Sequence, residues 1–177
     1  LEEYVSDCVI LLDHRVENQI ATRRLRVVKY RGSTHYANEY PTMIGTHGLS
    51  VMPLSSLGLS YPVSKARIST GLKQLDAMLG GRGYFRGSSI LVSGSAGTGK
   101  TSFAVAFADK VCRSGHRCLY LSFEESPEQP IRNMSSVGFD LEPWVDKKLL
   151  QFRSQRVGMY GLENHLVNMQ SWVDEFS

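Results

Sequence analysis

Short apolar runs separated by polar turns occupy the first third of the chain. Three of these runs, at residues 9–12, 24–30 and 49–52, have the length and composition of β-strands. The segments between them contain Asp-His-Arg, Arg-Gly-Ser and Gly-Thr-His-Gly, which are typical of turns. The pattern therefore predicts an antiparallel β meander over residues 1–52.

The pattern changes at residues 53–65, where Pro, Ser and Gly follow neither a helical nor a strand period and indicate a linker. Beyond this segment, strand-like apolar runs alternate with stretches of helical period. Such alternation predicts an α/β fold with a parallel sheet. The expected strands are 89–93, 117–123 and 148–153, and the expected helices are 100–113, 127–137 and 161–176.

The composition is that of a globular protein, because 42% of the 177 residues are apolar, enough for a packed core. A formal net charge of +3 is too small by itself to indicate a nucleic-acid or membrane partner. Cys8, Cys112 and Cys118 are odd in number and lack metal-ligand spacing, which favours free thiols over disulfides. With no basic leader and no apolar stretch of about 18 residues, the sequence predicts a cytoplasmic protein with no membrane span.

The strongest chemical signal is the segment Gly94-Ser-Ala-Gly-Thr-Gly-Lys-Thr101, which lies between an expected strand and an expected helix. Its glycines allow the backbone to turn N–H groups onto an anion, the Lys100 ammonium can reach terminal phosphates, and the Thr101 hydroxyl can ligand a metal. A plain glycine-rich turn is the alternative, which the flanking elements disfavour. The sequence thus predicts a site for ATP and Mg²⁺. Its nucleotide-binding residues are Gly94, Ser95, Ala96, Gly97, Thr98, Gly99, Lys100, Thr101 and Ser102, with Thr101 also the metal ligand.

Two carboxylates, Glu124 and Glu125, follow the expected strand at 117–123, which we expect to neighbour the strand before the glycine loop. Open α/β sheets bind ligands at the carboxyl ends of their strands. Either glutamate could orient or deprotonate the oxygen that attacks a phosphate. They could equally cap the next helix, because Glu-Ser-Pro-Glu with Pro127 is a helix-start signature. Both interpretations stay open at this point.

The densest basic segment contains Arg23, Arg24, Arg26, Lys29 and Arg31. On a regular strand, side chains alternate between the two faces of the sheet. We therefore expect Arg24 and Arg26 on one face and the other three on the opposite face. One face could bind phosphate, whereas a solvated strand protected by its charge is the structural alternative.

Most of the chain resembles the KaiC family of RecA-type ATPases. Residues 68–102, which open with Ile-Ser-Thr-Gly-Leu and end in the glycine loop, resemble the start of such a domain, and Ser122-Phe-Glu-Glu-Ser126 matches too. Upstream segments look like the closing part of a preceding KaiC domain, at residues 2–7, 23–35 and 39–41. The family carries two such domains in tandem.

The resemblance implies three regions: residues 1–52 are the C-terminal β segment of a first domain, 53–65 a linker, and 66–177 the beginning of a second domain. The implied fold class is α/β, a partial RecA-like P-loop NTPase domain with helices on both faces of a parallel sheet, preceded by the β meander. A P-loop fold also needs a metal-binding Asp at the end of an apolar strand. In the family that strand comes later, beyond Ser177, and the similar run Val9–Asp13 is interpreted as a hairpin strand.

KaiC proteins assemble as two-tiered hexameric rings with ATP between adjacent subunits. By this resemblance, Lys29, Arg31 and His35 would contact nucleotide in trans, across a subunit boundary, which is a known device in phosphoryl transfer. The resemblance also implies a homo-oligomeric regulatory ATPase with a signalling or clock-like role and regulatory protein partners. It raises serine/threonine autokinase activity as a further activity of the full-length protein, although the family's phosphorylation pair would follow Ser177.

Two other classes of function stay open. A DNA-dependent recombinase or helicase would use ATP to move along a strand, but the basic residues after the glycine loop are too dispersed to form a stacking platform. Nucleic acid is therefore not an expected partner. The other class is a non-catalytic module in which nucleotide stabilises an assembly. Salt-dependent binding of single-stranded DNA would support the first class, and tight ATP binding without turnover would support the second.

Overall fold

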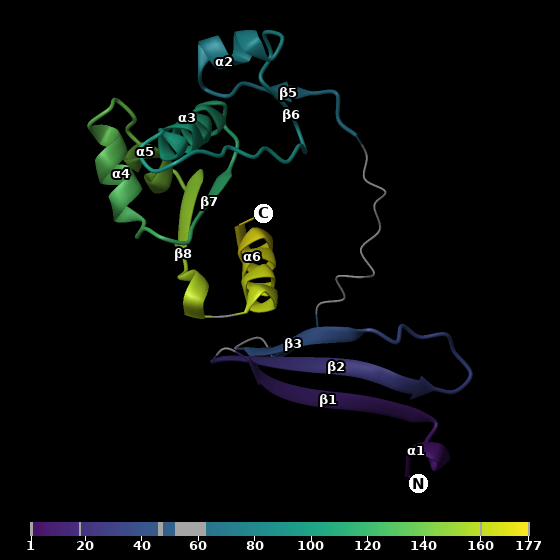
Figure 1. Cartoon of the computed structure of the whole chain (residues 1–177). Coiled ribbons are helices and arrows are strands. Elements are labelled where there is room, and N and C mark those ends of the chain that lie inside the picture. Colours follow the sequence, from purple (N-terminus) through teal and green to yellow (C-terminus); the bar gives the residue numbers. More distant parts are fainter. Residues whose placement is uncertain (1, 18, 46–47, 52–62, 160, 177) are drawn as a thin grey trace. The chain divides into compact units, whose positions relative to one another are not determined.

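The computed structural model describes residues 2–17, 19–45, 48–51, 63–159 and 161–176, which form two compact units (Figure 1). The first unit takes in Leu1–Ser60 and Val157–Glu175, and the second takes in Tyr61–Arg156 with Phe176. Most of the linker expected at 53–65 lies outside the described residues.

An antiparallel sheet with the order β1-β2-β3-β4 forms the first unit, which confirms the expected meander. Sequence patterns missed the third strand, because Pro41 lies inside it and proline cannot donate a ladder hydrogen bond. Short η2 (Val157–Met159) and the helix α6 (Leu162–Phe176) follow the second unit in the chain. The sheet and the helix before it comprise α1 (Glu2–Val5), β1 (Cys8–Glu17), β2 (Ile20–Tyr30), β3 (Glu39–Gly45) and β4 (Gly48–Val51).

Strand β2 contains one extra residue relative to β1. Val9 pairs with Lys29, whereas the next residue, Ile10, pairs with Val27, so Val28 has no counterpart on β1. This is a β-bulge, which interrupts the alternation of side chains along the strand that carries it.

The bulge changes which basic residues share a face. Opposed residues of an antiparallel pair project from the same side of a sheet. Arg24, Arg26 and Lys29 therefore share one face, and Arg23 projects from the other, so our expectation that Lys29 opposes Arg24 and Arg26 is wrong. On β1, Arg24 pairs with Asp13, Arg26 with Leu11 and Lys29 with Val9, and these three partners project from one side of that strand.

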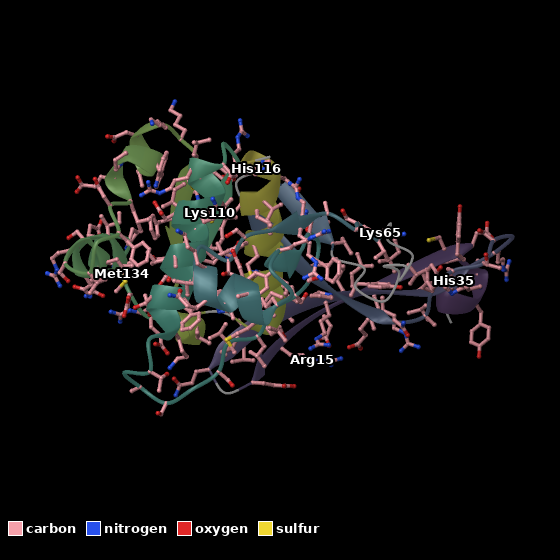
Figure 2. All side chains as sticks on the ribbon, turned by 90° about the horizontal axis from the view of Figure 1, so that it is seen from above. Arg15, His35, Lys65, Lys110, His116 and Met134 are labelled. Carbon is pink, nitrogen blue, oxygen red and sulfur yellow. The ribbon has the colours of Figure 1, made fainter. Side chains whose placement is uncertain are left out.

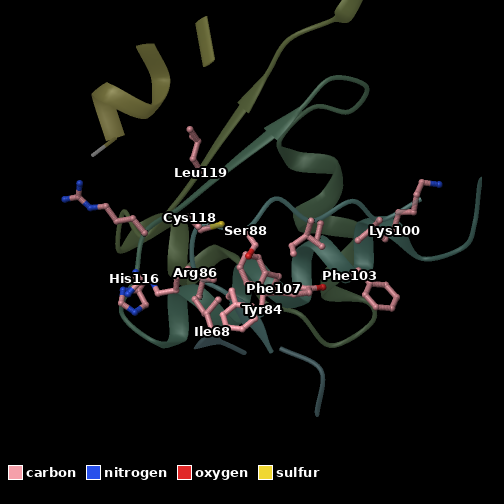
Figure 3. Close-up of a pocket in the computed structure, with 17 residues that line it drawn as sticks. Ile68, Tyr84, Arg86, Ser88, Lys100, Phe103, Phe107, His116, Cys118 and Leu119 are labelled. Carbon is pink, nitrogen blue, oxygen red and sulfur yellow. The ribbon is translucent and has the colours of Figure 1, made fainter. Parts of the chain in front are cut away.

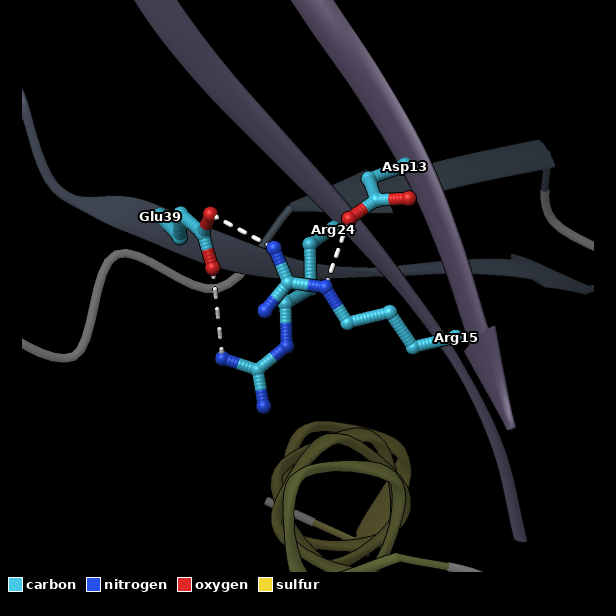
Figure 4. A network of polar contacts seen from close by, with 4 residues as sticks. All are labelled: Asp13, Arg15, Arg24 and Glu39. Carbon is cyan, nitrogen blue, oxygen red and sulfur yellow. Dashed lines mark hydrogen bonds and ion pairs between the residues drawn. The ribbon is translucent and has the colours of Figure 1, made fainter. Parts of the chain in front are cut away.

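A network of ion pairs joins three strands of this sheet (Figure 4). The Arg15 guanidinium donates to Asp13 Oδ2 at 2.6 Å and to Glu39 Oε1 at 2.9 Å. Arg24 Nη1 lies 3.7 Å from Glu39 Oε2. Exposed pairs of this kind contribute less than about 1 kcal/mol each. The contacts favour the structural interpretation for Arg24, whose charge already has a carboxylate partner.

The second unit is built around one long helix. Two short strands pair antiparallel, and two others, β7 and β8, pair in parallel. Val105, Ala108 and Cys112 of this helix pack with Leu141 and Leu150 to form the buried core. The elements are β5 (Arg67–Ile68), α2 (Lys73–Met78), β6 (Tyr84–Phe85), α3 (Lys100–Arg113), β7 (Cys118–Ser122), α4 (Glu128–Ser135), α5 (Glu142–Asp146) and β8 (Leu150–Ser154).

A buried carboxylate ties α5 to α3. Asp109 is 7% exposed, and it accepts hydrogen bonds from Trp144 Nε1 at 2.8 Å and from Arg113 Nε at 2.7 Å. The guanidinium of Arg113 also lies over the Trp144 ring. Because both carboxylate oxygens have charged or polar partners, the buried charge is compensated.

The expected strand at 89–93 does not form, which is a correction to the sequence interpretation. Residues 89–93 lie outside the pairings of the described sheets, and Leu91 is 90% exposed. An apolar run becomes a strand only when a neighbour completes its hydrogen bonds. Within the described residues β7 pairs with β8, so our expectation that β7 lies beside the glycine-loop strand is also wrong.

A carboxylate anchors the start of α2. Asp76 accepts hydrogen bonds from the hydroxyl of Ser69 and from the main-chain N–H and hydroxyl of Thr70, the latter two at 2.8 and 2.7 Å. Thr70 is 2% exposed. These bonds, led by that of Ser69, lower the pKa of Asp76 below its usual value, because they stabilise the ionised form.

This carboxylate makes folding of the second unit pH-dependent. The stability that Asp76 contributes is present above the pKa of an unfolded Asp, about 3.9, and is lost as pH falls through the lower folded value. Asp76→Asn should therefore lower the free energy of unfolding near neutral pH and make it fall less steeply with pH below about pH 4. Urea unfolding at a series of pH values measures this, with Asp146→Asn, at an exposed position, as the control. If stability falls as steeply at low pH in Asp76→Asn as in the unmodified protein, Asp76 is not the source of the pH dependence.

Candidate functional site

The glycine loop adopts a backbone that only glycine tolerates well. Gly97 has φ +79°, and Gly99, which precedes α3, has φ +89°. Both values lie in the left-handed region that L residues disfavour. At Gly94 the limit is space, because a Cβ there would lie 2.5 Å from Thr98 Oγ1. The loop is thus a close backbone turn that leads directly into a helix.

Lys100 is the first residue of α3 and folds back over this loop. Its ammonium donates to the main-chain oxygens of Gly94 and Ser95, both at 2.8 Å. The hydroxyl of Thr98 also donates to Ser95 O, at 2.9 Å. An ammonium has three donors, so one remains for a ligand while the loop is held by the other two.

The first turn of α3 adds main-chain donors next to this loop. The N–H groups of the first helical turn have no partner within a helix and carry partial positive charge. Thr101 and Ser102 lie in this turn and are half-buried, whereas Lys100 is exposed. The predicted nucleotide-binding residues therefore combine free main-chain donors, one cation and a hydroxyl, a set that fits a polyphosphate.

Glu124 and Glu125 follow the carboxyl end of β7, and both side chains are exposed. The main chain of Glu125 is fixed from both parallel strands, since its N–H donates to Ser122 Oγ at 3.1 Å and its oxygen accepts from Ser154 Oγ at 3.0 Å. The strand ends thus hold this pair of carboxylates toward solvent.

The helix-capping alternative for these glutamates has no support in the contacts. The N-cap position of α4 is Pro127, and no side chain caps it. It is Glu128, inside the first turn, whose pKa is lowered by its own backbone N–H and by the Ser126 hydroxyl. The Glu-Ser-Pro-Glu signature therefore acts through its last residue, which leaves Glu124 and Glu125 available for a ligand.

The predicted trans residues lie in the first unit. Lys29 Nζ donates to Tyr4 O at 3.2 Å, and Arg31 Nη2 donates to the same oxygen at 3.1 Å. Arg31 Nη1 also lies 3.3 Å from Asp7 Oδ1. His35 is exposed in the loop after β2, toward the end of the sheet away from Arg15 (Figure 2). The structure therefore brings Lys29 and Arg31 together.

A cavity of about 710 Å³ in the second unit was not anticipated from the sequence (Figure 3). Its lining is mostly apolar and aromatic and includes Tyr84, Phe103, Phe107 and Leu119, with Lys100 among its residues. The spacing of Phe103 and Phe107 on α3, one turn apart, is the sequence signal that could have indicated an apolar face here.

Every helix in the described part of the chain is too short or too polar to cross a membrane.

A family model described as "ATPase: KaiC" matches residues 1–56 and 68–174.

Curated relatives match along almost the entire chain. "Circadian clock protein KaiC2" of Synechocystis sp. is 57% identical over 176 residues, which cover 99% of this chain and 31% of the relative. "Circadian clock oscillator protein KaiC" of Picosynechococcus sp. is 40% identical over 99% of this chain and 34% of its own length. The protein of the same description from Parathermosynechococcus lividus is 39% identical over 99% of this chain and 32% of its own length. The chain thus spans about a third of the length of these relatives.

Proposed function

Since the chain belongs to the KaiC family of ATPases, we propose that it is an ATP-binding part of a regulatory ATPase and that residues 94–102 hold the nucleotide. The observation that carries this proposal is the geometry of the loop. Gly97 and Gly99 turn the backbone tightly, and Lys100 lies over the loop at the start of α3.

ATP with Mg²⁺ fits the residues present. Main-chain N–H groups and the Lys100 ammonium would bind the phosphates, and the Thr101 hydroxyl would be a ligand of the metal. The close approach at Gly94, where a Cβ would collide with the Thr98 side chain, keeps this turn of the loop compact. Bound Mg²⁺ would offset negative charge on the phosphate oxygens.

Glu124 or Glu125 would orient or deprotonate the oxygen that attacks the terminal phosphate. Their exposure at the end of β7 and the two contacts that fix the main chain of Glu125 support this role. In hydrolysis, water forms the new bond to phosphorus as the bond to the ADP oxygen breaks, and the carboxylate accepts a proton from that water.

In the full-length protein, Lys29, Arg31 and His35 would contact nucleotide held by a neighbouring subunit of a homo-oligomer, expected to be a hexamer. Their positive charge would stabilise the charge that develops on the phosphates. A cytoplasmic location, a signalling or clock-like role with regulatory protein partners, and serine/threonine autokinase activity belong to the same proposal. Its support is the family and, for the contact in trans, the convergence of Lys29 and Arg31 on the main-chain oxygen of Tyr4.

Substitution of the two glutamates tests the proposed chemistry. In the full-length protein, Glu124→Gln with Glu125→Gln should lower ATP turnover by the second domain about a hundredfold or more while ATP binding persists, because a positioned base contributes roughly 10²–10⁴-fold. The single variants identify the residue that acts. Radiolabelled ATP measures turnover and self-labelling together, and Glu142→Gln, at an exposed position of α5, is the control.

Three outcomes are distinct. Turnover by the second domain, which is the part that Lys100→Ala removes, or covalent label that disappears in the double variant supports the regulatory ATPase or autokinase. Second-domain turnover that survives in the double variant rules out a role for these carboxylates. Tight binding without turnover in the unmodified protein would instead indicate a nucleotide-dependent assembly module.

A further inference from the structure

We propose that Asp7 is a positioning residue which, together with the main-chain oxygen of Tyr4, holds Lys29 and Arg31 as a pair of cations ready to receive phosphate. The inference rests on the proposed contact of Lys29 and Arg31 with a neighbouring subunit's nucleotide. It adds to that site the segment from Tyr4 in α1 to Asp7 before β1, for which the sequence predicted no role of its own.

The contacts converge on a short stretch of chain. Tyr4 O accepts from both Lys29 Nζ and Arg31 Nη2, at 3.2 and 3.1 Å. Asp7 contacts Arg31 twice, since its carboxylate lies 3.3 Å from Nη1 and its main-chain oxygen accepts from the Arg31 N–H at 2.9 Å. Arg31 is thus fixed through both its backbone and its guanidinium.

This arrangement keeps two like charges close together. Lys29 and Arg31 donate to one oxygen, although two cations at such a separation repel each other. The Asp7 carboxylate offsets part of this repulsion. The guanidinium of Arg31 has five donors, more than its contacts with Tyr4 and Asp7 use. Arg31 therefore keeps donors for an anion with more than one charge, such as the end of a polyphosphate.

The exposure of Asp7 and Arg31 indicates that their ion pair contributes little to the stability of the fold. The side chains of Asp7 and Arg31 are 82% and 58% exposed. Exposed ion pairs add less than about 1 kcal/mol to stability. The effect of the carboxylate is therefore expected in the orientation of Arg31 rather than in the stability of the sheet.

The test uses the full-length protein with Lys100→Ala, which confines ATP turnover to the nucleotide that Lys29 and Arg31 would contact. Asp7→Asn should lower kcat/KM for ATP about threefold to tenfold, mostly through kcat, with an unchanged melting temperature. Asp7→Glu, which restores the charge, should recover part of the loss. Asp13→Asn, which removes another exposed ion pair of the same sheet, is the matched control and should have no effect on turnover.

Arg31→Ala separates failure of this inference from failure of the proposed function. If Arg31→Ala leaves turnover unchanged, the trans role is wrong and the inference falls with it. If Arg31→Ala lowers turnover and Asp7→Asn does not, only the positioning role of Asp7 is overturned. If both lower turnover, Asp7→Asn should add nothing in the Arg31→Ala background, whereas an additive loss would show that Asp7 acts independently of Arg31.

Discussion

Replacing Lys100 with alanine is expected to remove ATP binding at the glycine loop, with a loss in affinity of about a hundredfold or more. Hydrogen bonds to charged groups are worth about 1.5–3 kcal/mol each, so the one ammonium donor that the loop leaves for a phosphate, together with the positive charge, accounts for a loss of this size. Lys100 is the cation at the first position of α3, 2.8 Å from two carbonyl oxygens of the loop, so no other side chain of the loop can replace its charge.

Binding of ATP to the full-length protein, measured by equilibrium dialysis, would show this loss as fewer nucleotides bound per subunit. Lys73→Ala is the matched control, because Lys73 is also the first residue of a helix and is exposed. Little change in folding stability is expected, since the two bonds of Lys100 are on an exposed side chain. Unchanged stoichiometry and affinity in Lys100→Ala would refute the assignment of the loop.

Gly71→Ala is expected to destabilise the second unit by about 3 kcal/mol or more. Gly71 has φ +86°, which is strained for alanine, and it packs directly on α3. A Cβ at this position would lie 2.2 Å from the main-chain oxygen of Ala106, a buried residue of that helix. Relief would require the segment before α2 to move away from α3, the helix that carries Lys100 and Thr101.

Substitution of a second glycine separates the effect of backbone strain from that of the steric collision. Gly80 has φ +76°, yet a Cβ there would have no atom within 4 Å. Gly80→Ala should therefore cost only the strain of the left-handed backbone, about 1–2 kcal/mol. Chemical denaturation of the two variants beside the unmodified protein measures the difference. Equal destabilisation would mean that Gly71 does not pack against Ala106 as described.

Local patterns predicted elements well where the signal lies in the residues themselves. The helix expected at 100–113 begins and ends as α3 does, because the glycine loop marks its start and its apolar face is regular. The run at 89–93 has equally strong strand propensity, but strand formation depends on a partner that propensity does not encode. Short α2 was missed since its six residues lie among glycines.

The candidate site was predictable to a similar extent. The motif from Gly94 to Thr101 predicts phosphate binding, since each residue type has one function in a phosphate cradle. Tyr4 and Asp7 contact Lys29 and Arg31, which lie more than twenty positions away in the sequence. No pattern within either segment predicts these contacts. Only strand pairing brings such segments together, so local patterns could not reveal them.

The bulge in β2 lets this strand carry one extra residue without turning Lys29 to the other face. Val28 is 41% exposed and is the extra residue, which the bulge absorbs so that Lys29 stays on the same face as Arg24 and Arg26. Deletion of one residue between Arg26 and Lys29 would place these two cations two positions apart, so regular alternation without a bulge would keep both on this face. Replacement of Val28 by another residue would leave the pairing of Lys29 with Val9 unchanged. The face that Lys29 occupies is therefore tolerant of this one change in the length of the strand.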